Sequence, residues 1–299
     1  MRGADRGVAL GLYRSRHERD LLEGALARGV RRLDTSFNYH QFASHRTLVK
    51  VAEDLLPEFD ISTKVGFFPD EAGRPVHHLT PEILRYGVRL TVDDLDLEPS
   101  TILLHNPEQS LANLPPAEAL ERLQAACAVL DEAQAEGLCG EWGWSTWNPQ
   151  PILSALTVAE HALQPAVIMV RAGLLVDSDG LDDAERLFEM LDIPAEGRWG
   201  MSPFGGNAQE PVWDEVDARV YLAGGALCTQ PQAVFRTAFE LPAVDRVVVG
   251  TENLTHLSDL VMATTLQVDA ELVSTYRGLL RRRRAEQHQL ESRLARVRS

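Results

Sequence analysis

Cysteine and long apolar runs are both scarce in this sequence. Only three cysteines are present, Cys127, Cys139 and Cys228, and no two of them form a C-x-x-C pair. An odd number of widely spaced cysteines suggests neither a disulfide framework nor a cysteine zinc site. No apolar run approaches the roughly 18 residues of a membrane-spanning helix, and the apolar stretch near the start is too short for the core of a signal peptide. We therefore expect a cytoplasmic protein without a membrane-spanning segment.

Positive charge is also in short supply. The 29 lysines and arginines stand against 44 aspartates and glutamates, so the formal net charge is -15. Such a surface repels phosphate backbones, and nucleic acid is therefore not an expected partner. Residues 277–299 depart from this balance, because they contain eight arginines and two glutamates. Since no aromatic residue is interleaved with the "RRRR" run, we interpret this segment as a solvated helix resting on an acidic body rather than as a nucleic-acid arm.

Several catalytic signatures are missing. No G-x-S-x-G elbow, P-loop or H-E-x-x-H helix is present, so the usual sequence support for a hydrolase, a nucleoside triphosphatase or a zinc protease is lacking. No carboxylate cluster accompanies the adjacent His77 and His78, and we expect no metal site. No strand is followed by G-x-G-x-x-G, the glycine turn of dinucleotide-binding open sheets.

The sequence does contain a regular alternation of short β-rich runs with longer helical segments. Apolar positions at i, i+3 and i+4 predict helices between the runs, for example over 80–95 and 150–163. The eight predicted strands cover 8–12, 31–34, 60–64, 100–104, 140–144, 166–170, 198–202 and 245–250. This pattern, with no linker, predicts an α/β protein with a (β/α)8 TIM-barrel fold in which residues 1–299 form a single domain and 277–299 its basic helical C-terminal segment. A doubly wound open sheet is the alternative architecture.

Polar side chains follow several of the predicted strands. Asp34 ends the second strand, with Tyr39 in the loop beyond it, while Lys64 ends the third strand and His105 follows the fourth. In a TIM barrel the carboxyl ends of all strands open onto one mouth, where the active site lies. Each residue alone has a structural explanation as a turn, packing or surface residue. An acid, a base, a phenol and an imidazole on three consecutive strands together predict a catalytic site.

Four sequence blocks around these residues, "LDTSFNY", "STKVG", "LLHNPE" and "GWSTWN", resemble the aldo-keto reductase superfamily in their order and spacing. The "HNPE" block is similar to that of a bacterial subgroup. The resemblance covers nearly the whole chain and implies an NAD(P)H-dependent oxidoreductase that reduces a carbonyl or oxidises the corresponding alcohol. It also implies that Asp34, Tyr39, Lys64 and His105 form the catalytic tetrad.

The physical roles of the four residues are consistent with that chemistry. Carbonyl reduction needs a proton on oxygen, and a phenol with a pKa near 10 is a poor donor unless nearby cations lower its pKa. Lys64 is expected to lower the pKa of Tyr39, and Asp34 to keep Lys64 charged. His105 is expected to donate a hydrogen bond to the substrate oxygen.

The resemblance also implies a cofactor site and a substrate mouth. The expected cofactor residues are Ser145, Thr146, Met169, Ser202, Phe204, Gly205, Gly250, Thr251 and His256. The expected substrate-contacting residues are His40, Phe42, Phe67, Phe68 and Trp147. Three positions depart from the family pattern: Met169 replaces a glutamine, Met201 an aromatic residue and His256 an arginine. NADP(H) remains the more expected cofactor over NAD(H).

The main hypothesis is a reductase of a small polar or sugar-like molecule held by aromatic walls. Two alternatives use the same barrel. One is a regulatory module that binds NADP with weak or no turnover, which the altered nicotinamide pocket would suit. The other is a redox-neutral enzyme that uses Tyr39 as an acid. The expected partner in each case is a small molecule, and neither nucleic acid nor membrane is expected.

Overall fold

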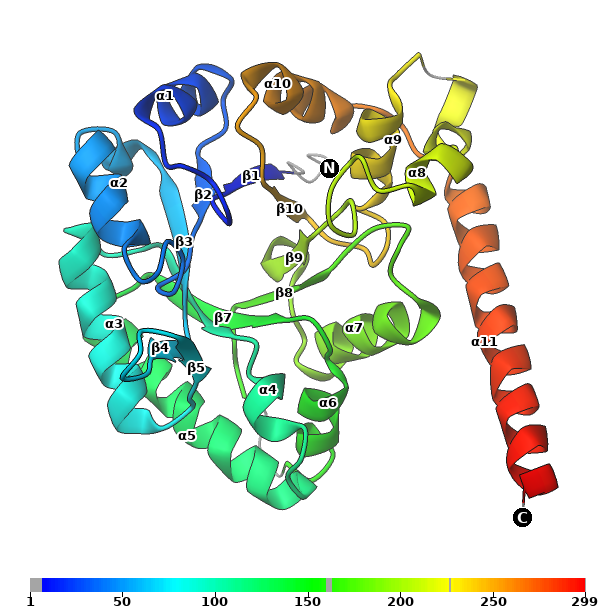
Figure 1. The fold of residues 1–299 in the computed structure, drawn as a ribbon, viewed down its shortest axis with the longest axis horizontal. Helices are drawn as coiled ribbons and strands as arrows, with labels where there is room; N and C mark the ends of the chain where they lie inside the picture. Colours follow the sequence, from blue (N-terminus) through cyan, green and yellow to red (C-terminus); the bar gives the residue numbers. More distant parts are fainter. Residues whose placement is uncertain (1–6, 160–162, 226, 299) are drawn as a thin grey trace.

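The computed structural model describes residues 7–159, 163–225 and 227–298. Eight parallel strands close into a barrel in the spatial order β1-β10-β9-β8-β7-β6-β3-β2 (Figure 1). The strands are β1 (Gly7–Gly11), β2 (Arg32–Asp34), β3 (Asp60–Val65), β6 (Thr101–His105), β7 (Glu141–Thr146), β8 (Val167–Arg171), β9 (Arg198–Met201) and β10 (Arg246–Val249). The predicted (β/α)8 barrel is confirmed. The open-sheet alternative is wrong, because β1 pairs with both β2 and β10 and leaves no free edge.

The eight predicted strands all occur, each close to its predicted bounds. Parallel barrel strands are covered by side chains on one face and by helices on the other, so they read as nearly continuous apolar runs. Strand β6 shows this, since all five of its residues are buried. The strand positions could therefore be found from short apolar runs bounded by turn residues.

Helices surround the barrel (Figure 1). They are α1 (Arg19–Ala27), α2 (Ser44–Ala52), α3 (Pro81–Leu95), α4 (Glu108–Leu111), α5 (Pro116–Ala135), α6 (Gln150–Leu156), α7 (Ser178–Met190), α8 (Val212–Glu215), α9 (Gln230–Thr237), α10 (Leu254–Ala263) and α11 (Ala270–Arg298). The predicted start of α3 is correct, with Thr80 at the N-cap and Pro81 in the first turn. The helix predicted over 150–163 ends earlier, at Leu156, and residues 160–162 of that prediction lie outside the described part of the chain.

A short hairpin that was not predicted from the sequence follows β3. Strands β4 (Phe67–Pro69) and β5 (Pro75–His77) pair antiparallel, and the Asp70 carboxylate accepts hydrogen bonds from the backbone N–H groups of Ala72 and Arg74 in the turn between them. The hairpin brings Phe67 to the mouth of the barrel. Strands of three residues are too short to show the alternation of apolar and polar residues that predicts a strand. The sequence therefore gave no signal for β4 and β5.

The C-terminal helix α11 runs along the outside of the barrel beside α7 (Figure 1). Arg277 forms ion pairs with Asp182 and Glu185, and Arg281 pairs with Asp182. The first turns of the basic segment thus pair with an acidic helix of the same chain. Within the described residues, no helix has the length and apolar character required to cross a bilayer.

Candidate active site

One cavity of about 1110 Å³ lies at the carboxyl ends of the barrel strands. The strand register places the predicted residues on neighbouring strands at similar depth: Asp34 is opposite Ser62, and Ser145 lies between His105 and Met169. All four residues of the expected tetrad, Asp34, Tyr39, Lys64 and His105, line this cavity.

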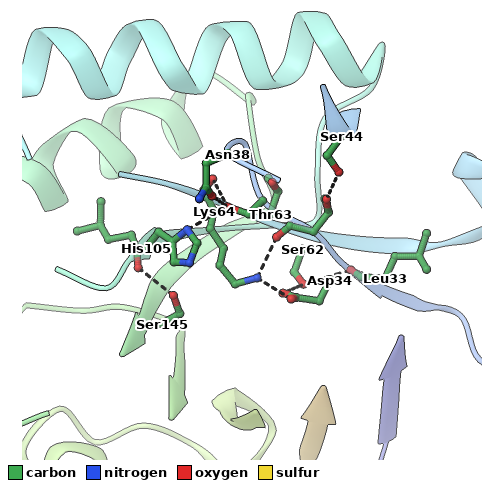
Figure 2. A network of polar contacts seen from close by, with 12 residues as sticks. Leu33, Asp34, Asn38, Ser44, Ser62, Thr63, Lys64, His105 and Ser145 are labelled. Carbon is green, nitrogen blue, oxygen red and sulfur yellow. Dashed lines mark hydrogen bonds and ion pairs between the residues drawn. The ribbon is translucent and has the colours of Figure 1, made fainter. Parts of the chain in front are cut away.

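A buried ion pair forms the base of the cavity. Lys64 Nζ lies 2.5 Å from Asp34 Oδ2 and donates a second hydrogen bond to the carbonyl of Thr35 at 2.9 Å (Figure 2). Ser62 Oγ donates to the other Asp34 oxygen, Oδ1, at 3.0 Å. The two charged side chains are only 3% and 5% exposed. Burial lowers the pKa of Lys64, while the Asp34 charge and hydrogen bond act in the opposite direction.

Tyr39 lies in the loop after β2, half-buried and facing the cavity. Lys64 Nζ lies 5.4 Å from the centre of the Tyr39 ring, and the Tyr13 ring packs against Tyr39 with 5.2 Å between centroids. The following residues His40, Gln41 and Phe42 all have positive φ values, between 50° and 66°, so the chain turns sharply directly after the phenol.

The expected effect of Lys64 on Tyr39 is not what the structure shows. Burial raises the pKa of Tyr39 well above its ordinary value, and the Asp34 charge raises it further. The prediction that nearby cations lower this pKa is therefore wrong for the structure described. The physical reason is that Asp34 lies 2.5 Å from Lys64, so the phenol lies beside a neutralised pair rather than a free ammonium.

His105 is buried and uncharged at neutral pH. Burial and then the Lys64 charge lower the pKa of His105 well below its ordinary value. Its Nδ1 lies 3.0 Å from Ser36 Oγ, and Ser36 Oγ donates its single proton to Asn38 Oδ1 at 2.6 Å. Ser36 must then accept from His105 Nδ1–H, which leaves Nε2 as an acceptor. Turning the Asn38 amide by 180° reverses both bonds and moves the proton to Nε2, the state that the expected donor role requires.

A second polar network lies behind the tetrad. His17 Nε2 is 2.6 Å from Ser44 Oγ. Ser44 Oγ in turn lies 2.7 Å from Thr35 Oγ1, a bond that Figure 2 marks at the labelled Ser44. His45 Nε2 lies 2.8 Å from Thr63 Oγ1. Burial lowers the pKa of His17 to about 4 and that of His45 to about 3. Both rings are therefore neutral at pH 7 and tie the loops around β2 and β3 together.

Most of the expected cofactor residues line the same cavity. They are Ser145, Met169, Ser202, Phe204, Gly205, Gly250, Thr251 and His256. Thr146 does not line it, because this residue is fully buried and its Oγ1 accepts a hydrogen bond from the Asn148 backbone N–H. The backbone N–H groups of Thr255 and His256 at the start of α10 are bound by the Asn253 side chain at 2.8 and 3.2 Å. Those two donors are thus already used within the protein.

The expected substrate residues divide into two groups. Phe67 and Trp147 line the cavity, whereas His40, Phe42 and Phe68 do not. Phe68 is 6% exposed and packs under α3, where a side chain at Gly87 would overlap its ring. The Phe42 ring packs edge-on against Phe37 in the core, with 5.5 Å between centroids. These three residues are therefore not part of the mouth.

His40 is held away from the cavity by its own contacts. Its Nε2 lies 2.5 Å from the Ser15 carbonyl oxygen, and its ring stacks on His17 at 4.2 Å. The loops after β1 and β2 thus close on one another, a contact that the sequence did not predict.

Several lining residues were not found from the sequence. They are Gly11, Tyr13, Arg14, Ser15, Asn38, Asn106, Glu252 and Asp259. Asn106 stands inside the recognised "HNPE" block, directly after His105, so its position in the motif was a usable signal. Tyr13, Arg14 and Ser15 follow the carboxyl end of β1. Because the loops at the carboxyl ends of all eight strands of a TIM barrel surround the mouth, their position could have predicted them.

Comparisons with known proteins agree with this geometry. Residues 10–192 match the model of the aldo/keto reductase family. The sequence is also 26% identical over 272 residues to pyridoxine 4-dehydrogenase of Escherichia coli strain K12, an alignment that covers 87% of this chain and 86% of that protein.

Solved structures show the same fold at lower identity. The holo form of an aldo-keto reductase from Bacillus halodurans superposes with a TM-score of 0.68 at 15% identity, covering 91% of each chain. A Bombyx mori aldo-keto reductase in complex with NADP gives a TM-score of 0.62 at 17% identity, covering 91% of this chain and 88% of that one.

Proposed function

The chain belongs to the aldo/keto reductase family and is an NAD(P)H-dependent reductase, and from this premise we propose that it reduces the carbonyl of a small polar, ring-bearing or sugar-like molecule with Tyr39 as the proton donor. The observation that carries the proposal is the meeting of Asp34, Tyr39, Lys64 and His105 on one cavity. The reverse reaction, alcohol oxidation, uses the same residues.

The cavity fits a nicotinamide dinucleotide together with a small substrate. Its volume of about 1110 Å³ exceeds the range of about 300–1000 Å³ that is usual for a single small ligand. It extends from Tyr39 past the loop after β9, at Ser202 and Gly205, to Thr251 after β10. When bound there, the nicotinamide ring supplies the hydride that the carbonyl carbon receives.

The proton chemistry belongs to the chain's own residues. Burial raises the pKa of Tyr39, so the phenol keeps its proton at neutral pH and is the group that we propose to donate to a substrate oxygen. Lys64 and Asp34 hold the floor of the site, and neutral His105 orients the substrate oxygen once the Asn38 amide is turned.

We keep NADP(H) over NAD(H) as the proposed cofactor, and two observations bear on that choice. The Bombyx mori relative is in complex with NADP. At the end of the cavity near α10, however, this chain places Glu252 and Asp259, and the one arginine among the described lining residues is Arg14. These carboxylates weaken binding of the additional phosphate of NADP(H), so the preference should be small.

The substrate class follows from the walls near Tyr39. Phe67, Trp147 and Tyr13 supply aromatic surface, and Asn38 and Asn106 supply neutral polar groups. The name of the Escherichia coli relative, pyridoxine 4-dehydrogenase, points to a ring-bearing substrate for that protein. Aromatic walls with few charges suit such a ring here as well.

The test begins with the purified wild-type protein. Fluorescence titrations with NADPH and NADH should show binding of both, and reduction of pyridoxal and small sugar aldehydes should be detected by loss of NADPH absorbance. Tyr39→Phe should keep the dinucleotide affinity and fold but lower kcat by about 100-fold or more, the scale of a lost general acid. Tyr86→Phe, a matched change at an exposed tyrosine on α3, should leave kcat unchanged.

Two results would contradict the proposal. Tight NADPH binding without turnover of any carbonyl would favour the regulatory-module alternative. Full activity in Tyr39→Phe would remove the proposed acid.

A further inference from the structure

Asn106 is a buried polar residue that lines the cavity, and the oxygen of its side-chain amide is left without a hydrogen bond. It follows His105 at the end of β6, is 6% exposed, and contributes to the cavity wall. Its side-chain Oδ1 has no hydrogen-bond partner within the described residues. An amide in that position is costly to bury unless something pairs with it.

The backbone holds this amide in a defined place. The Asn106 N–H donates to the Ser145 carbonyl at 2.8 Å, and its carbonyl accepts from Gln109 at 3.0 Å. Its φ of 56° lies in the left-handed region, which asparagine tolerates better than most side chains. The side chain is thus placed by a rigid strand end and a turn, which is how binding groups are usually supported.

The groups around Asn106 offer few other neutral hydrogen bonds. Met169, beside Ser145 in the barrel register, has no strong donor or acceptor, and Thr146 is turned away from the cavity. The Ser145 hydroxyl donates only a long bond of 3.4 Å to the Leu104 carbonyl. A bound neutral polar group next to His105 would therefore find its amide partner in Asn106.

We infer that the Asn106 amide binds a neutral group that can both donate and accept hydrogen bonds, held next to the reacting carbonyl. This inference rests on the proposed reductase function. Two sources carry this chemistry: a hydroxyl on the substrate carbon adjacent to the carbonyl, and the carboxamide of the nicotinamide. Each would supply a hydrogen-bond donor for Asn106 Oδ1, which has no partner within the described residues.

The experiment uses Asn106→Gly, which removes the amide and suits the left-handed backbone, and Asn106→Asp, which keeps the shape but cannot donate from that side chain when ionised. Dissociation constants for NADPH are measured by fluorescence without substrate. Values of kcat/KM are then measured for lactaldehyde and propanal, which differ by one hydroxyl beside the carbonyl. Asn113→Gly, at an exposed asparagine after α4, is the matched control.

A substrate contact predicts that both Asn106 variants lower the lactaldehyde-to-propanal ratio of kcat/KM by about tenfold, with NADPH affinity within about twofold of wild type. A carboxamide contact predicts about tenfold weaker NADPH binding and an unchanged ratio. Thermal unfolding of each variant checks that the fold is retained.

The inference fails if the wild type turns over both aldehydes while Asn106→Gly alters neither the ratio nor the NADPH affinity by more than about twofold. That result would leave the proposed reductase intact. A wild type that binds neither dinucleotide would overturn the proposed function, and this inference with it.

Discussion

The two sides of the cavity mouth are built differently. The side formed by β2, β3 and β6 carries a buried ion pair, Asp34 and Lys64, with hydrogen bonds that continue outward to buried histidines. The side formed by β8, β9 and β10 presents Met169, Met201 and Val248, followed by loops. We call these the ion-pair side and the apolar side.

The difference shows where substitutions can be tolerated. Removing one member of a buried ion pair leaves an uncompensated charge, so the ion-pair side resists change at single positions. On the apolar side, exchange of one apolar or neutral side chain for another leaves no buried charge unpaired and should cost less. The departures from the family pattern, Met169, Met201 and His256, all lie on the apolar side.

The largest expected effect comes from Lys64→Met on the ion-pair side. This change leaves Asp34 buried without its counter-charge, so the free energy of unfolding should fall by about 3–5 kcal/mol. Turnover should also fall by about 100-fold, because the site loses the ammonium that offsets the Asp34 charge and holds the floor beneath Tyr39. Urea denaturation and steady-state kinetics measure the two effects.

A second variant separates stability from catalysis. The double variant Asp34→Asn, Lys64→Met removes both charges, so most of the stability should return while turnover stays low. Equal instability in the single and double variants would mean that the ion pair is not the source of the effect.

The next expected effect is a loss of stability at acidic pH. His17 and His45 have pKa values of about 4 and 3 in the folded protein, below the ordinary value of 6.5 for histidine in an unfolded chain. The unfolded state therefore binds more protons below pH 6.5, and stability present above that pH is lost as the pH falls toward 4. For His17 alone the loss is about 3 kcal/mol.

Urea denaturation between pH 7 and 4 measures this loss. His45→Gln should reduce the slope of unfolding free energy against pH, because one buried titrating ring is gone. His288→Gln, at an exposed position of α11, should leave the slope unchanged. A slope that is the same in all three proteins would exclude the buried histidines as its cause.

The smallest expected effect lies on the apolar side. Glu252 lines the cavity and accepts hydrogen bonds from the Arg16 backbone and guanidinium at 2.7 and 3.1 Å. Glu252→Gln removes a negative charge where the additional phosphate of NADP(H) is proposed to lie. NADPH should therefore bind about three- to tenfold more tightly than to the wild type, whereas the affinity for NADH should not change. Fluorescence titration gives both constants.

Glu18→Gln is the matched control for this prediction. Glu18 pairs with the same Arg16 at 3.3 Å but does not line the cavity. If Glu252→Gln changes NADPH and NADH affinity equally, then Glu252 does not discriminate between the dinucleotides.

The barrel, and the place of Asp34, Lys64 and His105 at its cavity, were accessible from the sequence because they depend on local patterns. Strands that are buried on both faces read as apolar runs, and the ends of such strands meet at one mouth. Asp34, Lys64 and His105 could therefore be assigned to one cavity from their places at the ends of β2, β3 and β6.

The surroundings of these residues could not be assigned in the same way. Phe67 and Phe68 are adjacent in the sequence, yet one lines the cavity and the other packs under α3. Which of the two rings faces the cavity depends on the β4–β5 hairpin, whose strands are too short to be predicted from the sequence. It also depends on contact with α3, which lies further along the chain.

The sequence by itself determined the fold class and which residues stand at the strand ends, because both follow from the order and periodicity of residues along the chain. Only the tertiary structure decided the sign of the pKa shift at Tyr39, the separation of His40 from the mouth and the lack of a partner for Asn106 Oδ1 within the described residues. These properties depend on distances between residues from different loops and strands, and on how much water reaches them. A linear pattern contains neither.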